Sequence, residues 1–296
     1  MTSADLESFR VRGYVIFRGV FTKEEVLELR KRVGLLRTRE LADGRNILRE
    51  PEYPGVLNIL GDLLGKEEFR EFDYLTLHPR IVDVAHQLLG GDLVYSGDSA
   101  VQIGQGGRGF HKDNVTKYDP AGADWHGDYP LVRIGIYLQD HERYSGGLKV
   151  RVGSHLRASH RSGSAVNIPS AAGDIVAWNL RITHSANAVR MKGFPNLCLH
   201  PRIERILPPW LRVPEERERM VFFCTYGLAG DHLKRFMEDQ AQREDCREFF
   251  KRSCVNGELL ELARRRGVRF CAPIPDYGSL HPGHDRTISS QPSGGR

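Results

Sequence analysis

LVRIGIYLQ (residues 131–139) and DIVAW (174–178) are short apolar runs rich in β-branched residues, and they indicate that the middle of this chain consists of β-strands. Short strands at close spacing, with glycine, proline or polar turn residues between them, are typical of an antiparallel sandwich or barrel. We therefore expect a mainly β protein whose core occupies about residues 93–227. The other runs of this kind are LVYSG (93–97), AVQIG (100–104), GLKVRV (147–152), AVNIP (165–169) and MVFFCTYG (220–227).

Helices are expected on both sides of this β core. Thr22 and Glu25 have the spacing of a capping box, which predicts a helix from about Lys23. PRIVDVAHQLLGG (79–91) predicts a second helix that stops at its two glycines, and residues 230–266 also have a helical pattern. The apolar stripe expected on the first helix consists of Val26, Leu27, Leu29, Val33 and Leu36.

The elements predict one domain over residues 1–282, in which the helical segments 1–92 and 230–266 buttress the β core. With 40% hydrophobic residues, the 296-residue chain can bury a substantial core. Residues 283–296 are rich in glycine, proline and serine and have little to bury, so we expect a disordered tail.

Charge and cysteine content limit the function classes. The net charge of +5 would suit an anionic substrate, but acids are interspersed among the basic residues, which argues against a nucleic-acid surface. Five cysteines without a CxxC pair indicate reduced thiols and no disulfide framework. The N-terminal stretch has no apolar signal region, and no apolar run is long enough to span a membrane, so we expect a soluble cytoplasmic protein without a membrane partner.

The segment GQGGRGFHKDN (104–114) carries the first candidate metal ligands. In an extended segment residues i and i+2 point to the same side, so His111 and Asp113 can share one ion. A third ligand is expected from a later, neighbouring strand, and His184, which follows the apolar strand in GDIVAWNLRITHS, is the candidate. Two imidazoles and one carboxylate form the facial triad of non-haem iron(II) oxygenases, which leaves positions open for a 2-oxo acid and dioxygen.

The residues around these ligands resemble the phytanoyl-CoA hydroxylase-like family of iron(II)- and 2-oxoglutarate-dependent dioxygenases in order and spacing. The resemblance implies a double-stranded β-helix (jelly-roll, cupin-like) core, iron(II) bound by His111, Asp113 and His184, and 2-oxoglutarate and O2 as co-substrates. The segments that carry it are FRVRGYVIFRGVFTKEEVLELR (9–30), HPRIVDVAHQLLG (78–90), HKD (111–113), YLQDHERYSGGLKVRVGSH (137–155), AGDIVAWNLRITHSAN (172–187) and RMVFFCTYG (219–227).

In this family an arginine that leads the last barrel strand binds the distal carboxylate of 2-oxoglutarate, and Arg219 is the matching position. Arg190 competes for this role because it follows His184 closely, but Arg219 directly precedes a strand and is favoured. The planar guanidinium can pair with both carboxylate oxygens. Further candidate contacts to the co-substrate or substrate, each with core packing or turn chemistry as the ordinary alternative, are Gln102, Trp178 and Ser185.

Residues 186–218 are an insertion relative to the short connection that the family has between its distal histidine and its last strand. The segment is long and without clear periodicity, but its aromatic and apolar residues argue against disorder. Two interpretations stay open: a substrate lid, or a contact in a homo-oligomer.

The expected reaction is hydroxylation of a small-molecule metabolite, of the kind found in natural-product biosynthesis, with release of succinate and CO2. Asp113 argues against halogenation, because related halogenases lack the carboxylate ligand; desaturation, ring closure and epimerisation stay open. One alternative is a metal-dependent, cupin-like isomerase or hydrolase that does not use 2-oxoglutarate. Another is a non-catalytic family member that acts as a binding protein. The sequence does not distinguish a monomer from a homo-oligomer.

Overall fold

The computed structural model describes residues 3–43, 47–50, 53–60, 75–104, 109–243 and 257–270, so the predicted tail at 283–296 lies outside the described residues. The α-helices are α1 (Ser3–Arg12), α2 (Lys23–Asp43), α4 (Pro79–Leu89), α5 (Pro201–Ile206), α6 (Asp231–Gln242) and α8 (Gly257–Arg265). The strands are β1 (Tyr14–Phe17), β2 (Ile47–Glu50), β3 (Tyr53–Leu60), β4 (Leu93–Ile103), β5 (Leu131–Tyr137), β6 (Gly147–Arg151), β7 (Ala165–Asn167), β8 (Ile175–Asn179), β9 (His184–Ala188), β10 (Met220–Leu228) and β11 (Val268–Phe270).

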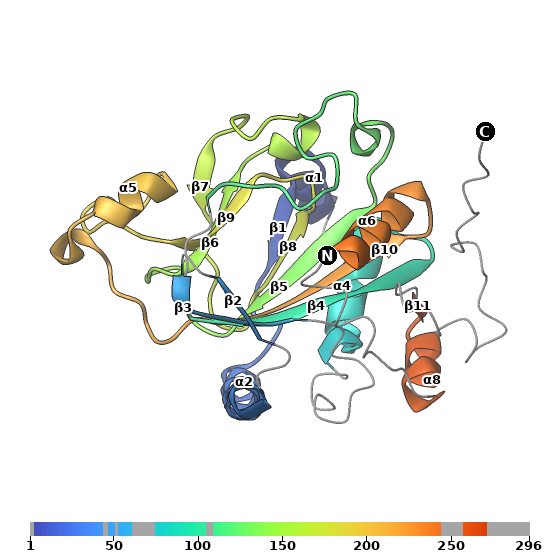
Figure 1. Ribbon diagram of the computed structural model, residues 1–296, viewed down its shortest axis with the longest axis horizontal. Coiled ribbons are helices and arrows are strands. Elements are labelled where there is room, and N and C mark those ends of the chain that lie inside the picture. Colours follow the sequence, from blue (N-terminus) through green and yellow to red (C-terminus); the bar gives the residue numbers. More distant parts are fainter. Residues whose placement is uncertain are drawn as a thin grey trace.

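Two sheets form the core, as predicted (Figure 1). The major sheet has the order β1-β8-β5-β10-β4-β3-β2, with β11 pairing in parallel with β4, and the minor sheet has the order β7-β6-β9. Residues of both sheets share one buried cluster: Tyr137, Val176 and Trp178 of the major sheet pack with Leu148 and Val150 of the minor sheet. The sheets therefore face one another, and the side chains between them line the interior of a jelly-roll.

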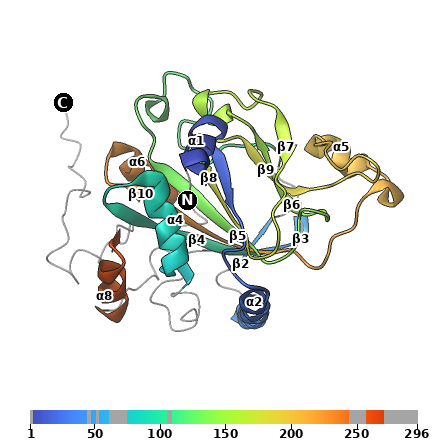
Figure 2. The same ribbon diagram turned by 180° about the vertical axis from the view of Figure 1, so that it is seen from behind.

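The other face of the major sheet is covered by helices (Figure 2). Along each strand, side chains alternate between the two faces, so Ile134 and Ile136 of β5 point away from the interior, toward the helices. They belong to the largest buried cluster, which includes Val33 of α2, Ile81 of α4 and Leu259 of α8. This layer fixes the major sheet and leaves its inner face to the functional groups.

Helix α2 begins at the predicted capping box. The Glu25 amide donates to Thr22 Oγ1 at 3.2 Å, and the Thr22 amide donates to Glu25 Oε2 at 2.7 Å. Of the predicted stripe, Val26, Val33 and Leu36 are buried, but Leu27 is 58% exposed. Leu27 is about 100° around the helix from Val26, so it points away from the sheet.

Thr22→Ala is expected to lower the free energy of unfolding by about 1 kcal/mol, because the Glu25 amide loses its acceptor at the helix start. Thr38→Ala is the matched control, since the Thr38 hydroxyl only donates to the Gly34 carbonyl within the helix. Urea unfolding measures both values. A loss in Thr22→Ala no larger than in Thr38→Ala would contradict the capping role.

The region before Leu93 contributes more strands than expected. The sequence predicted a helical segment for residues 1–92, but β2 and β3 form a hairpin that extends the major sheet next to β4. Pro54 in β3 interrupts a simple strand pattern, and proline is tolerated near sheet edges, so only the tertiary pairing reveals these strands. Among the described residues, no helix combines the length and apolar character needed to cross a membrane.

Candidate metal and co-substrate site

Backbone hydrogen bonds bring the predicted metal ligands together at one end of the jelly-roll. The amide of His111 donates to the carbonyl of His184, and the amide of His184 donates to the carbonyl of His111, each at 2.9 Å. Two residues further on, the Asp113 amide donates to the Leu180 carbonyl at 3.1 Å. The segment with the HxD pattern is thus paired with the segment that leads into β9, which explains how residues distant in sequence can share an ion.

The donor atoms of the triad converge. One ligand atom from each of His111, Asp113 and His184 lies within 4.8 Å of the other two. Asp113 Oδ1 lies 3.6 Å from His111 Nε2, and Asp113 Oδ2 lies 3.6 Å from His184 Nε2. The imidazole centroids are 4.3 Å apart. Three ligand atoms at this spacing leave room for one ion between them.

The histidine tautomers suit metal binding. His111 Nδ1 lies 2.9 Å from the Gly109 carbonyl, and His184 Nδ1 lies 3.3 Å from the Ile182 carbonyl. A carbonyl only accepts hydrogen bonds, so Nδ1 is protonated in both rings, and Nε2 presents a lone pair. Burial lowers the pKa of His184 to about 4, although the charge of Asp113 opposes the shift, so this ring is neutral at pH 7. Two imidazoles and one carboxylate fit iron(II), and no fourth protein ligand joins the described cluster.

Arg219 is buried inside the jelly-roll. The side chain is 1% exposed, its Nε donates to the Gly146 carbonyl at 3.0 Å, and its Nη1 donates to Gln102 Oε1. Within the part of the chain that the structure describes, no carboxylate forms an ion pair with this guanidinium. Burial lowers the pKa of Arg219, which reflects the cost of keeping a charge here. Glu215 acts on this charge only from beyond ion-pair distance. A buried cation without a paired carboxylate is suited to bind an anionic ligand.

Of the other residues predicted to contact the co-substrate or substrate, Trp178 lies near the triad and Ser185 points away from it. Trp178 is 1% exposed and its indole lies 5.8 Å from the imidazole of His184, centroid to centroid. Its Nε1 is buried, and no described residue accepts a hydrogen bond from it. Ser185 pairs with Lys149, and His184 pairs with Val150, so Ser185 lies on the opposite face of the minor sheet from His184. The structure therefore brings Trp178 to the triad but not the side chain of Ser185.

Arg190, the alternative candidate for binding the distal carboxylate of 2-oxoglutarate, contacts the loop that joins β5 to β6. Its Nη1 donates to the His141 carbonyl at 3.3 Å, and its amide donates to Ser145 Oγ at 3.0 Å. These contacts tie the start of the insertion to the β5–β6 connection. Gln102 Oε1 accepts a hydrogen bond from Arg219 Nη1.

Arg133 and Asp98 are charged residues of the interior that the sequence analysis did not identify. Arg133 Nη2 lies 2.5 Å from Asp98 Oδ2, and Arg133 Nε lies 3.5 Å from Asp113 Oδ2. The sequence does contain a sign of Arg133: it is an arginine within the apolar run LVRIGIY, and a charge inside a buried strand needs a partner. Without the strand register, that partner could not be named.

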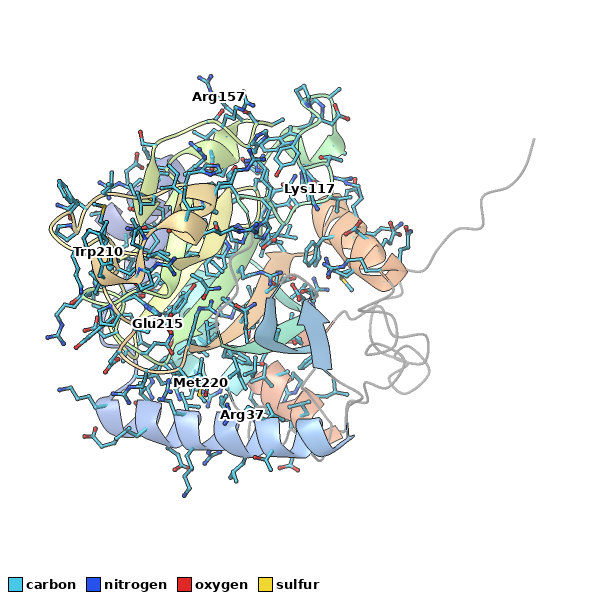
Figure 3. All side chains as sticks on the ribbon, turned by 60° about the vertical axis from the view of Figure 1, so that its left-hand side comes forward. Arg37, Lys117, Arg157, Trp210, Glu215 and Met220 are labelled. Atoms are coloured by element: carbon cyan, nitrogen blue, oxygen red, sulfur yellow. The ribbon has the colours of Figure 1, made fainter. Side chains whose placement is uncertain are left out.

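The predicted insertion forms an arm, residues 189–218, that contains α5 and extends from the minor sheet (Figure 1). Lys149 of β6 is fully buried and forms an ion pair with Glu204 of α5, which also accepts from the Val189 amide at 2.8 Å. The side chain of Trp210 is 70% exposed at the outside of the arm (Figure 3). The buried pair fixes the root of the arm, whereas its tip presents apolar side chains to solvent.

Glu215 lies where the arm returns toward β10 (Figure 3). Burial raises the pKa of Glu215 to about 7, and the nearby charge of Arg219 offsets only part of this effect. Because the folded state binds this proton more tightly than the unfolded state does, the fold is more stable with Glu215 protonated than with Glu215 ionised. This contribution is complete below its ordinary pKa of 4.5 and is lost as the pH rises through about 7.

Glu215→Gln is therefore expected to gain stability relative to the wild-type protein between pH 5 and pH 8, by about 1 kcal/mol after allowance for the partial exposure of the carboxyl. Urea unfolding of both proteins at several pH values measures the difference. Glu218→Gln, which removes an exposed carboxylate from the same segment, is the control for net charge. A constant difference across this pH range would contradict the assignment.

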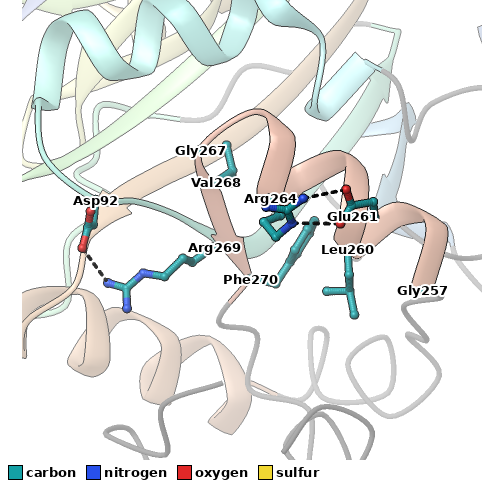
Figure 4. A pocket seen from close by; sticks show the side chains of 9 residues that line it. All are labelled: Asp92, Gly257, Leu260, Glu261, Arg264, Gly267, Val268, Arg269 and Phe270. Atoms are coloured by element: carbon teal, nitrogen blue, oxygen red, sulfur yellow. Dashed lines mark hydrogen bonds and ion pairs between the residues drawn. The ribbon is translucent and has the colours of Figure 1, made fainter. Parts of the chain in front are cut away.

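A hollow of about 420 Å³ lies between α8, β11 and Asp92 (Figure 4). Arg264 pairs with Glu261 there, and Arg269 pairs with Asp92. Leu259 of α8 and Val268 of β11 belong to the cluster on the outer face of the major sheet, so this hollow is separated from the triad by the sheet. It contains no group of metal ligands among the described residues.

The jelly-roll, the His-Asp-His triad and the buried arginine define the class of iron- and 2-oxoglutarate-dependent oxygenases. The chain belongs to the phytanoyl-CoA dioxygenase (PhyH) family, whose model matches residues 9–194, well over half of the sequence. It is accordingly an Fe(II)/2-oxoglutarate-dependent enzyme, as the sequence predicted. The match includes all three metal ligands and ends before Arg219. No curated protein matches the chain.

Solved structures with the same fold include enzymes of this class. SnoK, a carbocyclase of nogalamycin biosynthesis, has 20% identity and a TM-score of 0.54 over 77% of this chain and 84% of its own. HygX from Streptomyces hygroscopicus, solved with nickel, 2-oxoglutarate and hygromycin B, has 16% identity and a TM-score of 0.55 over 77% and 87%. EctD from S. alaskensis, solved with iron, has 19% identity and a TM-score of 0.52 over 77% of this chain and 76% of its own. These similarities confirm the predicted fold class.

Proposed function

We propose that this protein hydroxylates a small-molecule metabolite, of the kind made in natural-product biosynthesis, with conversion of 2-oxoglutarate to succinate and CO2. The observation that supports the proposal best is the combination of the convergent triad with a buried guanidinium that forms no ion pair with a carboxylate among the described residues. A site that binds only a metal ion would not need the buried guanidinium of Arg219. SnoK acts as a carbocyclase in nogalamycin biosynthesis and HygX binds hygromycin B, which agrees with a substrate from natural-product biosynthesis.

In this mechanism, His111, Asp113 and His184 hold the iron, and Arg219 holds the distal carboxylate of the co-substrate with Gln102 beside it. Bound iron(II) and 2-oxoglutarate supply the activation of dioxygen and the oxidising power for a substrate C–H bond. The protein supplies orientation: the tautomers of both histidines are fixed through Nδ1, and the guanidinium is fixed by the Gly146 carbonyl.

Apolar side chains of the interior exclude water from the reaction. Tyr137, Trp178 and Val221 are almost completely buried and line the inner face of the major sheet between the two ends of the site. A dry interior strengthens the pairing of Arg219 with a carboxylate. Trp178 contributes a free indole donor near His184 to the proposed substrate or co-substrate site.

The direct test is an anaerobic titration of iron(II) and 2-oxoglutarate into the metal-free protein, followed by a measurement of succinate released in air. A 2-oxo acid that chelates iron(II) gives a visible charge-transfer band, so the test needs no knowledge of the substrate. A saturable band with succinate release supports the proposal. If iron binds and neither signal appears, the cupin-like isomerase or hydrolase becomes the better hypothesis.

The net charge of +5 favours an anionic substrate, and this part of the proposal has its own test. In a substrate screen scored by succinate release, turnover of neutral or cationic compounds alone would contradict it. The cytoplasmic location expected from the sequence stays a prediction.

A further inference from the structure

Arg133 occupies an unusual position in the major sheet. Its neighbours on β5, Val132 and Ile134, point to the helical layer and are fully buried, whereas Arg133 points into the interior, where its side chain is 18% exposed. Charged side chains are rarely placed in such an environment unless they are paired. Arg133 meets two carboxylates, Asp98 and Asp113, one of which belongs to the triad.

A second carboxylate, that of Asp98, fixes the guanidinium of Arg133. Asp98 Oδ2 accepts from Arg133 Nη2 at 2.5 Å and from the Thr225 hydroxyl at 2.8 Å, so the carboxylate is itself held in place. The three residues come from three strands adjacent in the major sheet, β4, β5 and β10, and this makes the arrangement rigid. Burial disfavours the charge, but the carboxylates of Asp98 and Asp113 outweigh that effect and raise the pKa of Arg133.

The contact with the triad involves one defined atom pair. Arg133 Nε lies 3.5 Å from Asp113 Oδ2, which is an ion-pair distance and longer than a full hydrogen bond. Asp113 Oδ1, the other oxygen, lies 3.6 Å from His111 Nε2, whereas Oδ2 lies between Arg133 Nε and His184 Nε2, which is 3.6 Å away. A cation that engages one oxygen of a carboxylate favours metal coordination through the other oxygen. Outer partners of metal ligands typically change metal affinity by about 10- to 100-fold.

We propose that Arg133 is a positioning residue for the metal site: held by Asp98 and Thr225, it engages Oδ2 of Asp113 and directs Oδ1 toward the iron. The inference rests on the proposed function, since it takes Asp113 as a metal ligand. One-oxygen coordination by Asp113 leaves more of the coordination sphere open for the 2-oxo acid and dioxygen. Arg133 thereby links the rigidity of the major sheet to the geometry of the triad.

The test is the affinity of the metal-free protein for cobalt(II), whose visible absorption reports its ligand set, without 2-oxoglutarate or substrate. Arg133→Gln is expected to weaken binding by about 10- to 100-fold and to change the absorption spectrum. Arg133→Lys keeps a charge beside Asp98 but has no planar fork to reach both carboxylates, so it should fall between Arg133→Gln and the wild type. Thermal unfolding of each metal-free variant shows that it is folded.

Two controls separate positioning from general stability. Arg30→Gln removes another half-buried arginine, which donates to the Leu138 and Glu218 carbonyls away from the triad, and should bind cobalt(II) like the wild type. Asp98→Asn loosens the support of Arg133 and should weaken binding less than Arg133→Gln. In the double variant Arg133→Gln/Asp98→Asn the two losses should not add, because Asp98 acts through Arg133.

The outcomes are distinguishable. Wild-type affinity and spectrum in a folded Arg133→Gln or Arg133→Lys protein would overturn the positioning role, even if the variant melts earlier. Additive losses in the double variant would also overturn it. If the wild-type protein itself binds no metal, the proposed function fails, and the inference about Arg133 fails with it. This result differs from failure of the Arg133 inference alone, in which the wild type and the variants bind metal equally.

Discussion

Asp113→Ala is expected to lower the affinity of the protein for iron(II) by more than about 100-fold, beyond the loss that follows removal of an outer partner of a metal ligand. Asp113 is the only anionic group of the three convergent residues and is located between both imidazoles. Two neutral histidines cannot offset the positive charge of the ion, and Arg133 would then face it unshielded. Anaerobic titration of metal-free protein measures the change.

Asp119→Ala is the matched control for Asp113→Ala. It removes an exposed carboxylate from the same loop, whose Oδ1 only accepts from the Ala121 amide. Its iron affinity should equal that of the wild type. Retention of wild-type iron affinity in Asp113→Ala would show that the metal is held elsewhere, and it would remove the basis for the proposed mechanism.

The triad could be predicted because its signals are local. The HxD pattern needs only the alternation of an extended segment, and His184 follows a strongly apolar strand. The capping box at Thr22 is local for the same reason, and its hydrogen bonds confirm it. The donor atoms of the three candidate ligands converge in the structure, and their binding of iron stays a prediction. The pairing of His111 with His184 is long-range, but a closed sheet leaves few alternative positions for the third ligand.

The surroundings of the triad could not be predicted because they depend on strand register. A shift of one residue moves every side chain of a strand to the other face. The register of β9 against β6 places Ser185 beside Lys149 and away from the triad, although it is the residue next to His184. The pairing of β5 with β10 and β8 likewise turns Arg133 inward. Neither orientation follows from composition or spacing.

The same reasoning separates the two candidate arginines. Met220 pairs with Ile103, and Val221 pairs with Gln102, so the start of β10 and the end of β4 lie together and Arg219 reaches Gln102. Arg190 lies at the root of the arm, where its contacts are to the His141 carbonyl and Ser145. Proximity to His184 in sequence favoured Arg190, whereas the position before the last strand favoured Arg219. The contact with Gln102 supports Arg219, and its role as the anchor of 2-oxoglutarate stays a prediction.

Arg219→Gln is expected to raise the 2-oxoglutarate concentration that half-saturates the iron-loaded protein by about 10- to 150-fold, because one charge-assisted pair contributes about 1.5–3 kcal/mol. Iron affinity without 2-oxoglutarate should stay at the wild-type value, because Arg219 is not among the triad residues. The charge-transfer band measures the first quantity, and iron titration alone measures the second. Arg219→Lys should give an intermediate loss, since its ammonium cannot pair with both oxygens.

Arg190→Gln is the matched control, because it removes a second buried arginine near the same end of the minor sheet. Its half-saturation should stay within about twofold of the wild type if Arg219 is the anchor, a change of less than about 0.5 kcal/mol. The reverse pattern, in which Arg190→Gln binds 2-oxoglutarate more weakly and Arg219→Gln binds it like the wild type, would place the co-substrate at the root of the arm. Glu204, which pairs with Lys149 and accepts from the Val189 amide next to Arg190, would then connect the arm directly to co-substrate binding.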